Sequence, residues 1–568
     1  MNNKIRQFLN KGKEKLRRRL CRKNFADQKN PTFRGGNIRY SVTEKEGAVG
    51  YGGIGAIHTL VRRLKLDRLI NQGVRLLQRH VPYQESDHVL SMAYNILTGG
   101  ICLEDLKRLR QDEGYTKGLG AERIPDATTA GDFLRRFDEA SVIALQEAIM
   151  EARKKVWRQQ TAAFFEEAIL DADGTIAETT GECKEGMDIA YNGQWGYAPL
   201  VISLAQTKKV LYTVNRSGSR PSSEGAAEWL DRAIGHVAPY FKKVRLRGNT
   251  DFSQTQYLDG WNKRGIGFVF GYDAMANVIK LAEGLPKKSW QRLTRQPWYE
   301  VQTEERERPE NVKERIVKER EFQNIRLQSE DVAEFEYRPT SCKETYRMVV
   351  VRKNLTVEKG ERRLFDEVRF FFYLTNDRRM STAEVVFFAN DRCDQENLIA
   401  QLKMGVHALK MPAADLVSNW AYMVIGSLVW NLKAWYGLLM PDKAQGRKVV
   451  RMEFRSFVLQ FMLLPCQVVK AGRRLVYRIL KYTEQLEVFF ATFDRIRALN
   501  FTCTESGSDG FVGRDTMILQ LMFAYPPALC AAMPFGSPPL SELQWDSLFC
   551  LTCLRRRNTL VGKAAGTS

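Results

Sequence analysis

Carboxylates on separate segments of this chain could act together as ligands of metal ions. Asp171 and Asp173 lie in the run EEAILDADGT, whose residue types predict a strand. Because side chains alternate along a strand, both aspartates lie on one face, opposite Leu170 and Ala172. Hard oxygen ligands bind Mg²⁺, and two such ions roughly 4 Å apart catalyse phosphoryl transfer. Such a site needs further ligands from other elements.

The run VRLRGNTDF supplies a second segment, at the end of another predicted strand. Alternation places Arg245, Arg247, Asn249 and Asp251 on one face of that strand. Arg247 is a candidate for contact with a phosphate group. Asp251 could bind a metal ion, whereas the amide of Asn249 carries no charge.

Glu396 supplies the third acidic residue, in a predicted helix. Arg392 lies four residues before it and Lys403 seven residues after it. At ~100° per residue, the three side chains fall within about 60° of one another on one helix face. A carboxylate flanked by two cations could bind both a phosphate and a metal ion.

The surrounding segments predict a mixed α/β fold. From about residue 163, three strand-like runs are followed by a helix, a strand, a helix and a strand, which is the order of a mixed sheet with packed helices. Apolar residues recur at helical spacing before this region, from about 52 to 159. After it, a charge-dense stretch with alternating segments predicts a β-rich insertion rather than a continuation of the core. A long helix then starts at Ser381 or Thr382, with Glu384 placed to support the cap.

These patterns divide the 568 residues into several regions, since one hydrophobic core rarely exceeds ~300 residues. The predicted regions are a basic N-terminal arm at 1–50, a helical domain for DNA binding or dimerisation at 51–160, the first part of the core at 161–281, the β-rich insertion at 282–363, the second part of the core at 364–500, and a tail of unknown role at 501–568.

The charge balance indicates a polyanionic partner. Lys and Arg number 87 against 66 Asp and Glu, a net charge of +21, and nucleic acid is the first candidate. The residues singled out for DNA contact, beside Arg247, Arg392 and Lys403, are Arg17, Arg18 and Arg19 in the N-terminal arm, and Arg135 and Arg136 after a short capped helix. A solvated arm and a packing helix are the alternatives. In the insertion, Trp290 and Trp298 could stack on a flipped base or pack in a core.

Other features favour a cytoplasmic protein without a membrane partner. The 10 cysteines are scattered and nothing at the N-terminus resembles a secretory signal, which indicates a reducing compartment. The most apolar stretch, 417–440, is interrupted by polar residues, so we expect a buried helix rather than a membrane span.

Four motifs resemble bacterial insertion-sequence transposases of the DDE type, specifically the insertion sequence 1380 family. They are DADGT at 171–175, YNGQWGYAPL at 191–200, RGNTDFSQT at 247–255, and the Arg-x3-Glu-x6-Lys pattern of Arg392, Glu396 and Lys403. The resemblance covers roughly residues 50 to 500, and the family's tyrosine before this arginine is Ala389 here. It implies an RNase H-like core with a β-rich insertion, preceded by an α-helical DNA-binding domain. It also implies that Asp173, position 249 and Glu396 hold two Mg²⁺ ions, with Mn²⁺ as a substitute.

This chain departs from the family at its second acidic position. Relatives carry aspartate where this chain has Asn249, and an amide lacks the negative charge that a Mg²⁺ ligand supplies. We therefore expect metal binding and turnover to be weakened. Asp251, or Asp171 in place of Asp173, is the alternative ligand.

The resemblance implies a cut-and-paste DNA transposase. Such an enzyme binds terminal inverted repeats and target DNA as a homodimer, in the bacterial nucleoid. A DNA-binding protein that has lost its chemistry through Asn249 is one alternative, and a metal-dependent nuclease of the same fold is another.

Overall fold

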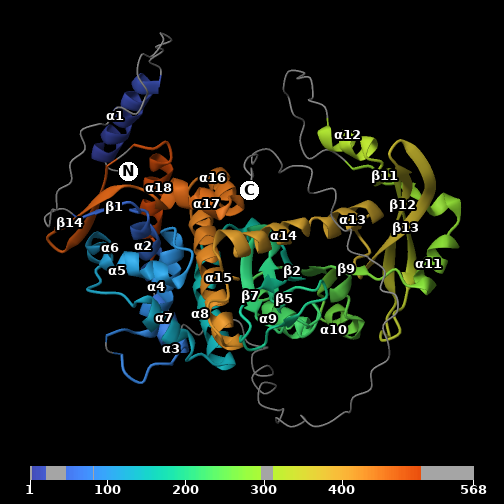
Figure 1. Ribbon diagram of the computed structural model, residues 1–568, viewed down its shortest axis with the longest axis horizontal. Coiled ribbons are helices and arrows are strands. Elements are labelled where there is room, and N and C mark those ends of the chain that lie inside the picture. Colours follow the sequence, from blue (N-terminus) through green and yellow to red (C-terminus); the bar gives the residue numbers. More distant parts are fainter. Residues whose placement is uncertain (1–2, 21–46, 81, 296–310, 481, 501–568) are drawn as a thin grey trace, which may run out of the picture. The chain divides into compact units, whose positions relative to one another are not determined.

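A mixed sheet forms the centre of the chain in the computed structural model, which describes residues 3–20, 47–80, 82–295, 311–480 and 482–500 (Figure 1). Among these residues the sheet has nine strands, in the order β10-β11-β12-β13-β9-β8-β2-β6-β7. The strands are β2 (Ala168–Gly174), β6 (Leu200–Leu204), β7 (Lys209–Val214), β8 (Val244–Gly248), β9 (Gly267–Tyr272), β10 (Gln291–Arg292), β11 (Gln323–Tyr337), β12 (Tyr346–Lys359) and β13 (Arg362–Thr375).

The centre of this sheet is mixed, as the sequence predicts. Strand β2 runs parallel to β8 and antiparallel to β6, and β8 runs parallel to β9. Every residue of β6 and β7 is buried, because helices cover the sheet, and strands in such a position are apolar almost throughout. Helix α9 (Ala226–Val237) packs on β2 and β6, α10 (Leu258–Lys263) lies between β8 and β9 in the chain, and α15 (Leu416–Leu438) packs on β7.

The β-rich region continues the central sheet, which corrects the prediction of a separate insertion. Strands β11, β12 and β13 pair with one another over most of their length, and Phe372 to Thr375 of β13 pair with β9. The predicted boundary at residue 363 therefore cuts through β13. α11 (Ala276–Glu283) and α12 (Val312–Glu319) belong to this part of the chain.

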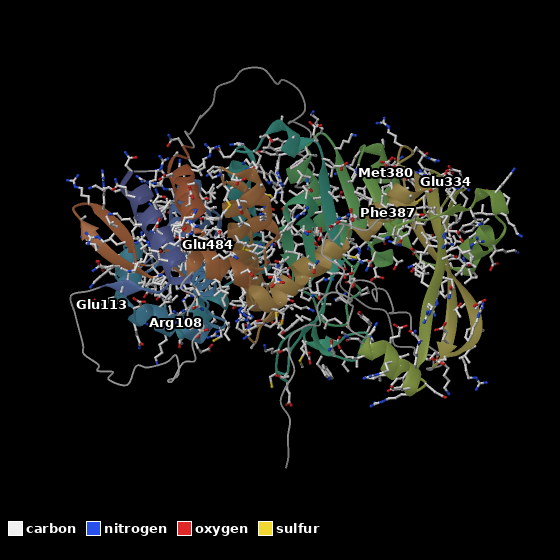
Figure 2. All side chains as sticks on the ribbon, turned by 90° about the horizontal axis from the view of Figure 1, so that it is seen from above. Arg108, Glu113, Glu334, Met380, Phe387 and Glu484 are labelled. Carbon is white, nitrogen blue, oxygen red and sulfur yellow. The ribbon has the colours of Figure 1, made fainter. Side chains whose placement is uncertain are left out.

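Helix α13 (Thr382–Asn390) covers this end of the sheet. Its Val385 and Val386 are fully buried in a cluster with apolar residues of β9, β11 and β12. Figure 2 labels Met380 and Phe387, which pack at the edge of the cluster, and Glu334 of β11. Arg347 of β12 donates hydrogen bonds to Glu334 and to the carbonyl of Met380, and so ties the start of the helix to the strands.

The helical region is built from both ends of the described chain. Its helices are α2 (Ile54–Leu64), α3 (Leu66–Gly73), α4 (Glu85–Leu97), α5 (Leu106–Gln111), α6 (Glu113–Leu119), α7 (Ala127–Leu134) and α8 (Glu139–Trp157). Strands β14 (Cys466–Ala471) and β15 (Arg474–Ile479) form a small sheet with β1 (Ala48–Val49), and α18 (Leu486–Arg497) packs on α2. The predicted boundaries at 51–160 and 364–500 therefore divide one structural region.

The structure also bears on the predicted tail, the basic N-terminal arm and the apolar stretch at 417–440. Residues 1–500 form one compact unit, whereas the second unit, 501–568, lies outside the described residues. α1 (Asn3–Leu20) is a helix within the basic arm, and α16 (Lys443–Arg451) packs on α15. Residues Ser418 to Gly437 of α15 are all buried. None of the helices in the described part of the chain is long and apolar enough to cross a membrane.

Candidate active site

Strand β2 presents Asp171 and Asp173 toward the same helices. Asp171 contacts Arg247, which also donates to the carbonyl of Phe388 in α13, and Asp173 contacts Arg392, just before α14 (Cys393–Ala400). Alternation along β2 therefore places both carboxylates on one face, as predicted.

Asp171 is closed off by an arginine. Arg247 makes two hydrogen bonds to its carboxylate, from Nε to Oδ1 at 2.6 Å and from Nη2 to Oδ2 at 2.8 Å. The two side chains are only 4% and 1% exposed, for Arg247 and Asp171 respectively. A third guanidinium donor reaches the carbonyl oxygen of Phe388 at 2.7 Å. This buried pair joins β2, β8 and α13, so Asp171 is not free to bind a metal ion and Arg247 is not exposed to DNA.

Asp173 lies near the edge of the sheet with a looser partner. The Nη1 atom of Arg392 donates to its Oδ2 at 2.9 Å, and Nη2 of the same side chain lies 3.8 Å from Oε1 of Glu396. Glu396 is 44% exposed, whereas Asp173 is 12% exposed. Arg392 therefore lies between two carboxylates that were predicted as metal ligands. The sequence predicted this arginine as a DNA contact and did not indicate that it bridges them.

The electrostatics of this site differ from those of an ordinary surface aspartate. Burial raises the pKa of Asp173 to about 6, and the negative charge of Glu396 contributes to the rise, while Arg392 opposes it. A carboxylate with such a pKa responds to any added cation near neutral pH. Perturbed acids of this kind are common at functional sites.

Position 249 follows strand β8 directly. Asp171 is level with Arg247 in the parallel pairing of β2 and β8, and Asp173 and Asn249 each lie two residues further along the chain, Asn249 just after β8 ends at Gly248. The backbone of Asn249 is still extended, and its side-chain oxygen accepts a hydrogen bond from the N–H of Asp251 at 3.1 Å. Asn249 therefore caps the short turn that follows β8.

Neither Asn249 nor Asp251 lies on β8, which corrects the prediction that both share a strand face with Arg245 and Arg247. Strand β8 ends at Gly248, and Asp251 lies in the 3₁₀ turn Thr250–Phe252. The residue is exposed, yet loss of hydration raises the pKa of its carboxyl, Asp273 adds to the rise, and Ser222 and Arg392 oppose it. Arg392 therefore acts on the pKa of both Asp173 and Asp251.

The helix that carries Glu396 is broken on both sides. Ser381 and Glu384 form the predicted capping box, which is confirmed, but α13 ends at Asn390 and α14 begins at Cys393. After α14 the chain forms a π-helical turn, Gln401–Gly405, which contains Lys403. The 100° spacing that grouped Arg392, Glu396 and Lys403 on one face does not apply across these breaks. Burial lowers the pKa of Lys403.

Gln395 is a residue of this site that the sequence did not indicate. It is 1% exposed, its Nε2 donates to the carbonyl of Val201 at 3.1 Å, and its Oε1 accepts from the hydroxyl of Ser203. Both partners belong to β6, which pairs Val201 with Asp173. Gln395 therefore anchors α14 to the sheet one residue before Glu396. A polar residue between charged neighbours gives no signal in the sequence that its side chain is buried.

The other predicted DNA contacts lie elsewhere in the fold. Arg17 and Arg18 are exposed on α1, where Arg18 pairs with Glu14 at 3.1 Å, and the side chain of Arg19 lies outside the described residues. Arg135 and Arg136 are exposed directly after α7. The cap of that helix is Asp126, which accepts from the N–H of Thr129 at 2.8 Å, and not a threonine.

Trp290 packs within the β-rich region. The guanidinium carbon of Arg352 lies 4.3 Å from the centre of its ring, and the ring of Phe370 lies 6.3 Å away. These contacts favour the packing alternative over base stacking. Trp298 lies outside the described residues.

The donor set does not fit two Mg²⁺ ions. Among the residues that the structure describes, no three Asp, Glu, His or Cys side chains are grouped as metal ligands. Asp173 and Glu396 supply anionic oxygens, but the third position supplies the amide of Asn249, which already caps a turn. In two-metal sites the two ions share carboxylate ligands. Without a carboxylate at position 249, the second ion lacks an anionic ligand.

Comparison with known proteins matches most of the chain to a family model. No curated protein matches the chain. Among solved structures, the cryo-EM structure of the piggyBac transposase synaptic complex with hairpin DNA matches with a TM-score of 0.30 and 10% identity, over 82% of this chain and 90% of that chain. The model of the family described as transposase DDE domain group 1 matches residues 43–501, which is most of the chain. The chain therefore belongs to the family of transposase DDE domains, group 1.

Proposed function

We propose that the chain is a DNA transposase whose strand cleavage and strand transfer depend on Asp173, position 249 and Glu396. The observation that carries the proposal is that Arg392 contacts Asp173 and lies near Glu396, while position 249 follows the strand that pairs in parallel with the strand of Asp173. Metal-assisted phosphoryl transfer requires carboxylates from separate elements, and in this proposal Asp173 and Glu396 supply two of them, while position 249 supplies an amide.

In this proposal the chain binds double-stranded DNA at the terminal inverted repeats of its element and at the target. The insertion sequence 1380 family, a homodimer that holds two ends, and a place in the bacterial nucleoid are parts of the same proposal. The net charge of +21 suits such a partner, because each neutralised phosphate releases counterions. The exposed Arg17, Arg18, Arg135 and Arg136 are proposed contacts.

Asn249 limits the chemistry in this proposal. Mg²⁺ or Mn²⁺ would supply charge neutralisation at the phosphate and activation of the attacking oxygen, and Asp173 and Glu396 are the residues that would hold it. Aspartate at 249 would add the missing anion. It would also keep the turn, because Asp and Asn are equally good caps. The Asn249→Asp variant should therefore fold as the original chain does.

The test compares the chain with its Asn249→Asp and Asn249→Ala variants. Each is incubated with an end-labelled duplex that carries the inverted repeats flanking the coding sequence, a supercoiled target plasmid, and Mg²⁺ or Mn²⁺. We expect all three proteins to bind the duplex, and cleavage and joining to appear only with Asn249→Asp. Efficient cleavage by the original chain would contradict the role of position 249 and favour Asp251.

The same experiment separates the alternative functions. Binding without cleavage by Asn249→Asp would favour a DNA-binding protein that has lost its chemistry elsewhere as well. Cleavage without joining to the plasmid would favour a nuclease of the same fold. Absence of binding by every form at moderate salt would overturn the assignment to DNA.

A further inference from the structure

A hairpin next to the active site carries aromatic side chains into solvent. This aromatic hairpin, residues 188–197, consists of β4 (Asp188–Ile189) and β5 (Trp195–Tyr197), which pair with each other, and β5 also pairs with β3 (Ala177–Glu178). Tyr191 is 90% exposed and Trp195 is 50% exposed. Within the described part of the chain, neither ring stacks on another ring or on a cation.

The turn of the aromatic hairpin is held firmly. The N–H groups of Ala190 and Gly193 donate to the carbonyls of Gln194 and Ala190, both at 2.9 Å. Gly193 has a φ of +80°, which favours glycine, and the side chain of Asn192 binds Gln194 at both its backbone and its amide. The exposed rings therefore project from an ordered turn, and a partner that covers them would remove apolar surface from water.

The aromatic hairpin extends the strands of the active site. Asp173 pairs with Val201 of β6, and the pairing continues outward through Thr175, which donates to Pro199, to Thr179, which donates to Trp195 at 3.1 Å. Trp195 is six residues before Val201, so it lies at most about 20 Å along the ladder from Asp173. At 3.4 Å per base pair, this distance corresponds to about six base pairs of DNA.

A pocket joins the aromatic hairpin to the segment that follows Glu396. Its volume is about 270 Å³, and it is lined by Ile176, Ala177, Glu178, Gln194, Lys403 and Leu409. Aliphatic side chains supply its apolar surface, Gln194 and Glu178 supply hydrogen-bonding groups, and Lys403 supplies a cation. Burial lowers the pKa of Lys403, so a phosphate beside it would favour the charged form of the amine.

We propose that the aromatic hairpin and this pocket hold DNA open beside the cleaved phosphate, which deepens the proposed function and rests on it. Tyr191 and Trp195 stack on bases that remain in the duplex, and one unstacked nucleotide enters the pocket. Lys403 contacts its phosphate, and Gln194 and Glu178 accept or donate hydrogen bonds at its base edge. Nucleic acid fits this surface because every base offers a π face to an exposed ring, and because the pocket combines a cation with groups that read a base edge.

The test uses the full chain with Asn249 in place, so that the DNA stays uncut. Duplexes carrying the flanking inverted repeat contain 2-aminopurine at one of the six positions on either side of the expected cleavage site. We expect bright fluorescence at one position when the chain binds, because a base in an aliphatic pocket is no longer quenched by its neighbours. In the Tyr191→Ala/Trp195→Ala double variant this signal should be lost, and the dissociation constant should rise roughly 5-fold or more, as stacking contacts of this size require.

Two control variants separate stacking from a general loss of structure. Tyr191→Phe/Trp195→Phe keeps aromatic faces and should keep the signal, whereas Leu459→Ala, at a side chain that is 58% exposed elsewhere in the chain, should change nothing. Duplex binding with no bright position would overturn this inference and leave the proposed function intact. Absence of duplex binding by the original chain would overturn both. If the double variant instead dissociated a DNA-free dimer and kept the bright position, the aromatic hairpin would be a protein interface and the inference would be wrong.

Discussion

Two aspartates two residues apart on β2 have different surroundings. Asp171 lies inside the sheet, where two hydrogen bonds from Arg247 enclose it at 1% exposure. Asp173 lies near the strand end, where Arg392 gives its carboxylate one hydrogen bond rather than two, and the side chain is 12% exposed and near Glu396. Both face the same helices and both meet an arginine. The difference is whether the arginine satisfies the acid completely, and only an incompletely satisfied acid can accept a metal ion.

The largest loss of stability should come from removing Arg247, the partner of the buried Asp171. In Arg247→Ala, Asp171 would remain buried without its partner, and breaking a buried pair on one side costs about 3–5 kcal/mol. Arg245→Ala is the matched control on the same strand, because Arg245 pairs with Glu167 in a more exposed position and should cost much less. Unfolding by urea measures both. Equal losses would mean that the Asp171 pair is not more important to the fold than its neighbour.

Removing the charge of Asp173 should stabilise the fold, whereas removing the partner of Asp171 should destabilise it. Burial raises the pKa of Asp173 from 3.8 to about 6, so the folded chain binds a proton more tightly than the unfolded chain between these values. Stability due to this group is therefore present at low pH and is lost as pH rises through 6. Asp173→Asn should raise the free energy of unfolding at pH 7.5, by at most about 3 kcal/mol, the equivalent of that pKa difference.

At pH 3.5 the carboxyl of Asp173 is protonated in the folded state and mostly protonated in the unfolded state, so the same substitution should change stability much less than at pH 7.5. Denaturation at the two pH values checks this prediction. An equal gain at both would indicate that packing, and not charge, causes the change. Mg²⁺ should protect the original chain against unfolding more than it protects Asp173→Asn.

Alternation was enough to predict that the two aspartates of β2 share a face. It placed Asp171 and Asp173 on one face, because a period of two residues is a local property, whereas the parallel pairing of β2 with β8 joins segments far apart in the chain and was not predicted. Alternation could not distinguish the closed acid from the open one. That distinction depends on Arg247 reaching across to β2 and on the carbonyl of Phe388, which are contacts between distant segments.

The helical side of the site was harder to predict for a related reason. A continuous helix was assumed from Ser381 through Lys403, but the chain breaks after Asn390 and forms a π-helical turn at Lys403. The break lets Arg392 turn toward Asp173, and Gln395 then fastens the new helix to β6. Similarly, the pairing of β13 with β9 joins residues about a hundred positions apart, which no local pattern reveals.

Substitution of Gln395 should cause a loss of stability between those expected for Arg247→Ala and Arg392→Gln. Gln395→Ala removes a buried amide that binds Val201 and Ser203, and leaving such partners unsatisfied costs about 1–3 kcal/mol. Asn397→Ala is the control, since Asn397 is exposed on the same helix. Urea unfolding measures the stability. In the Asn249→Asp background, cleavage of the labelled duplex should fall with Gln395→Ala even at saturating DNA, because Glu396 is then held less precisely. A loss of stability without a loss of cleavage would contradict a positioning role.

The smallest change in stability should come from the arginine of the open site. Arg392→Gln removes one hydrogen bond from Asp173, and at pH 5, where this acid is mostly protonated, the cost should be about 1 kcal/mol or less. Its effect on titration should be plain, because Arg392 is the cation that opposes the rise in the pKa of Asp173. Without it that pKa rises above 6, so the loss of stability with increasing pH should extend to higher pH than in the original chain.

Arg379→Gln, at an exposed neighbour of α13, should leave the pH profile unchanged. Unfolding free energies between pH 4 and 9 measure the shift. A profile that Arg392→Gln does not move would mean that Asp173 is as fully enclosed as Asp171, and the contrast between the two acids would not explain which of them is available to a metal ion.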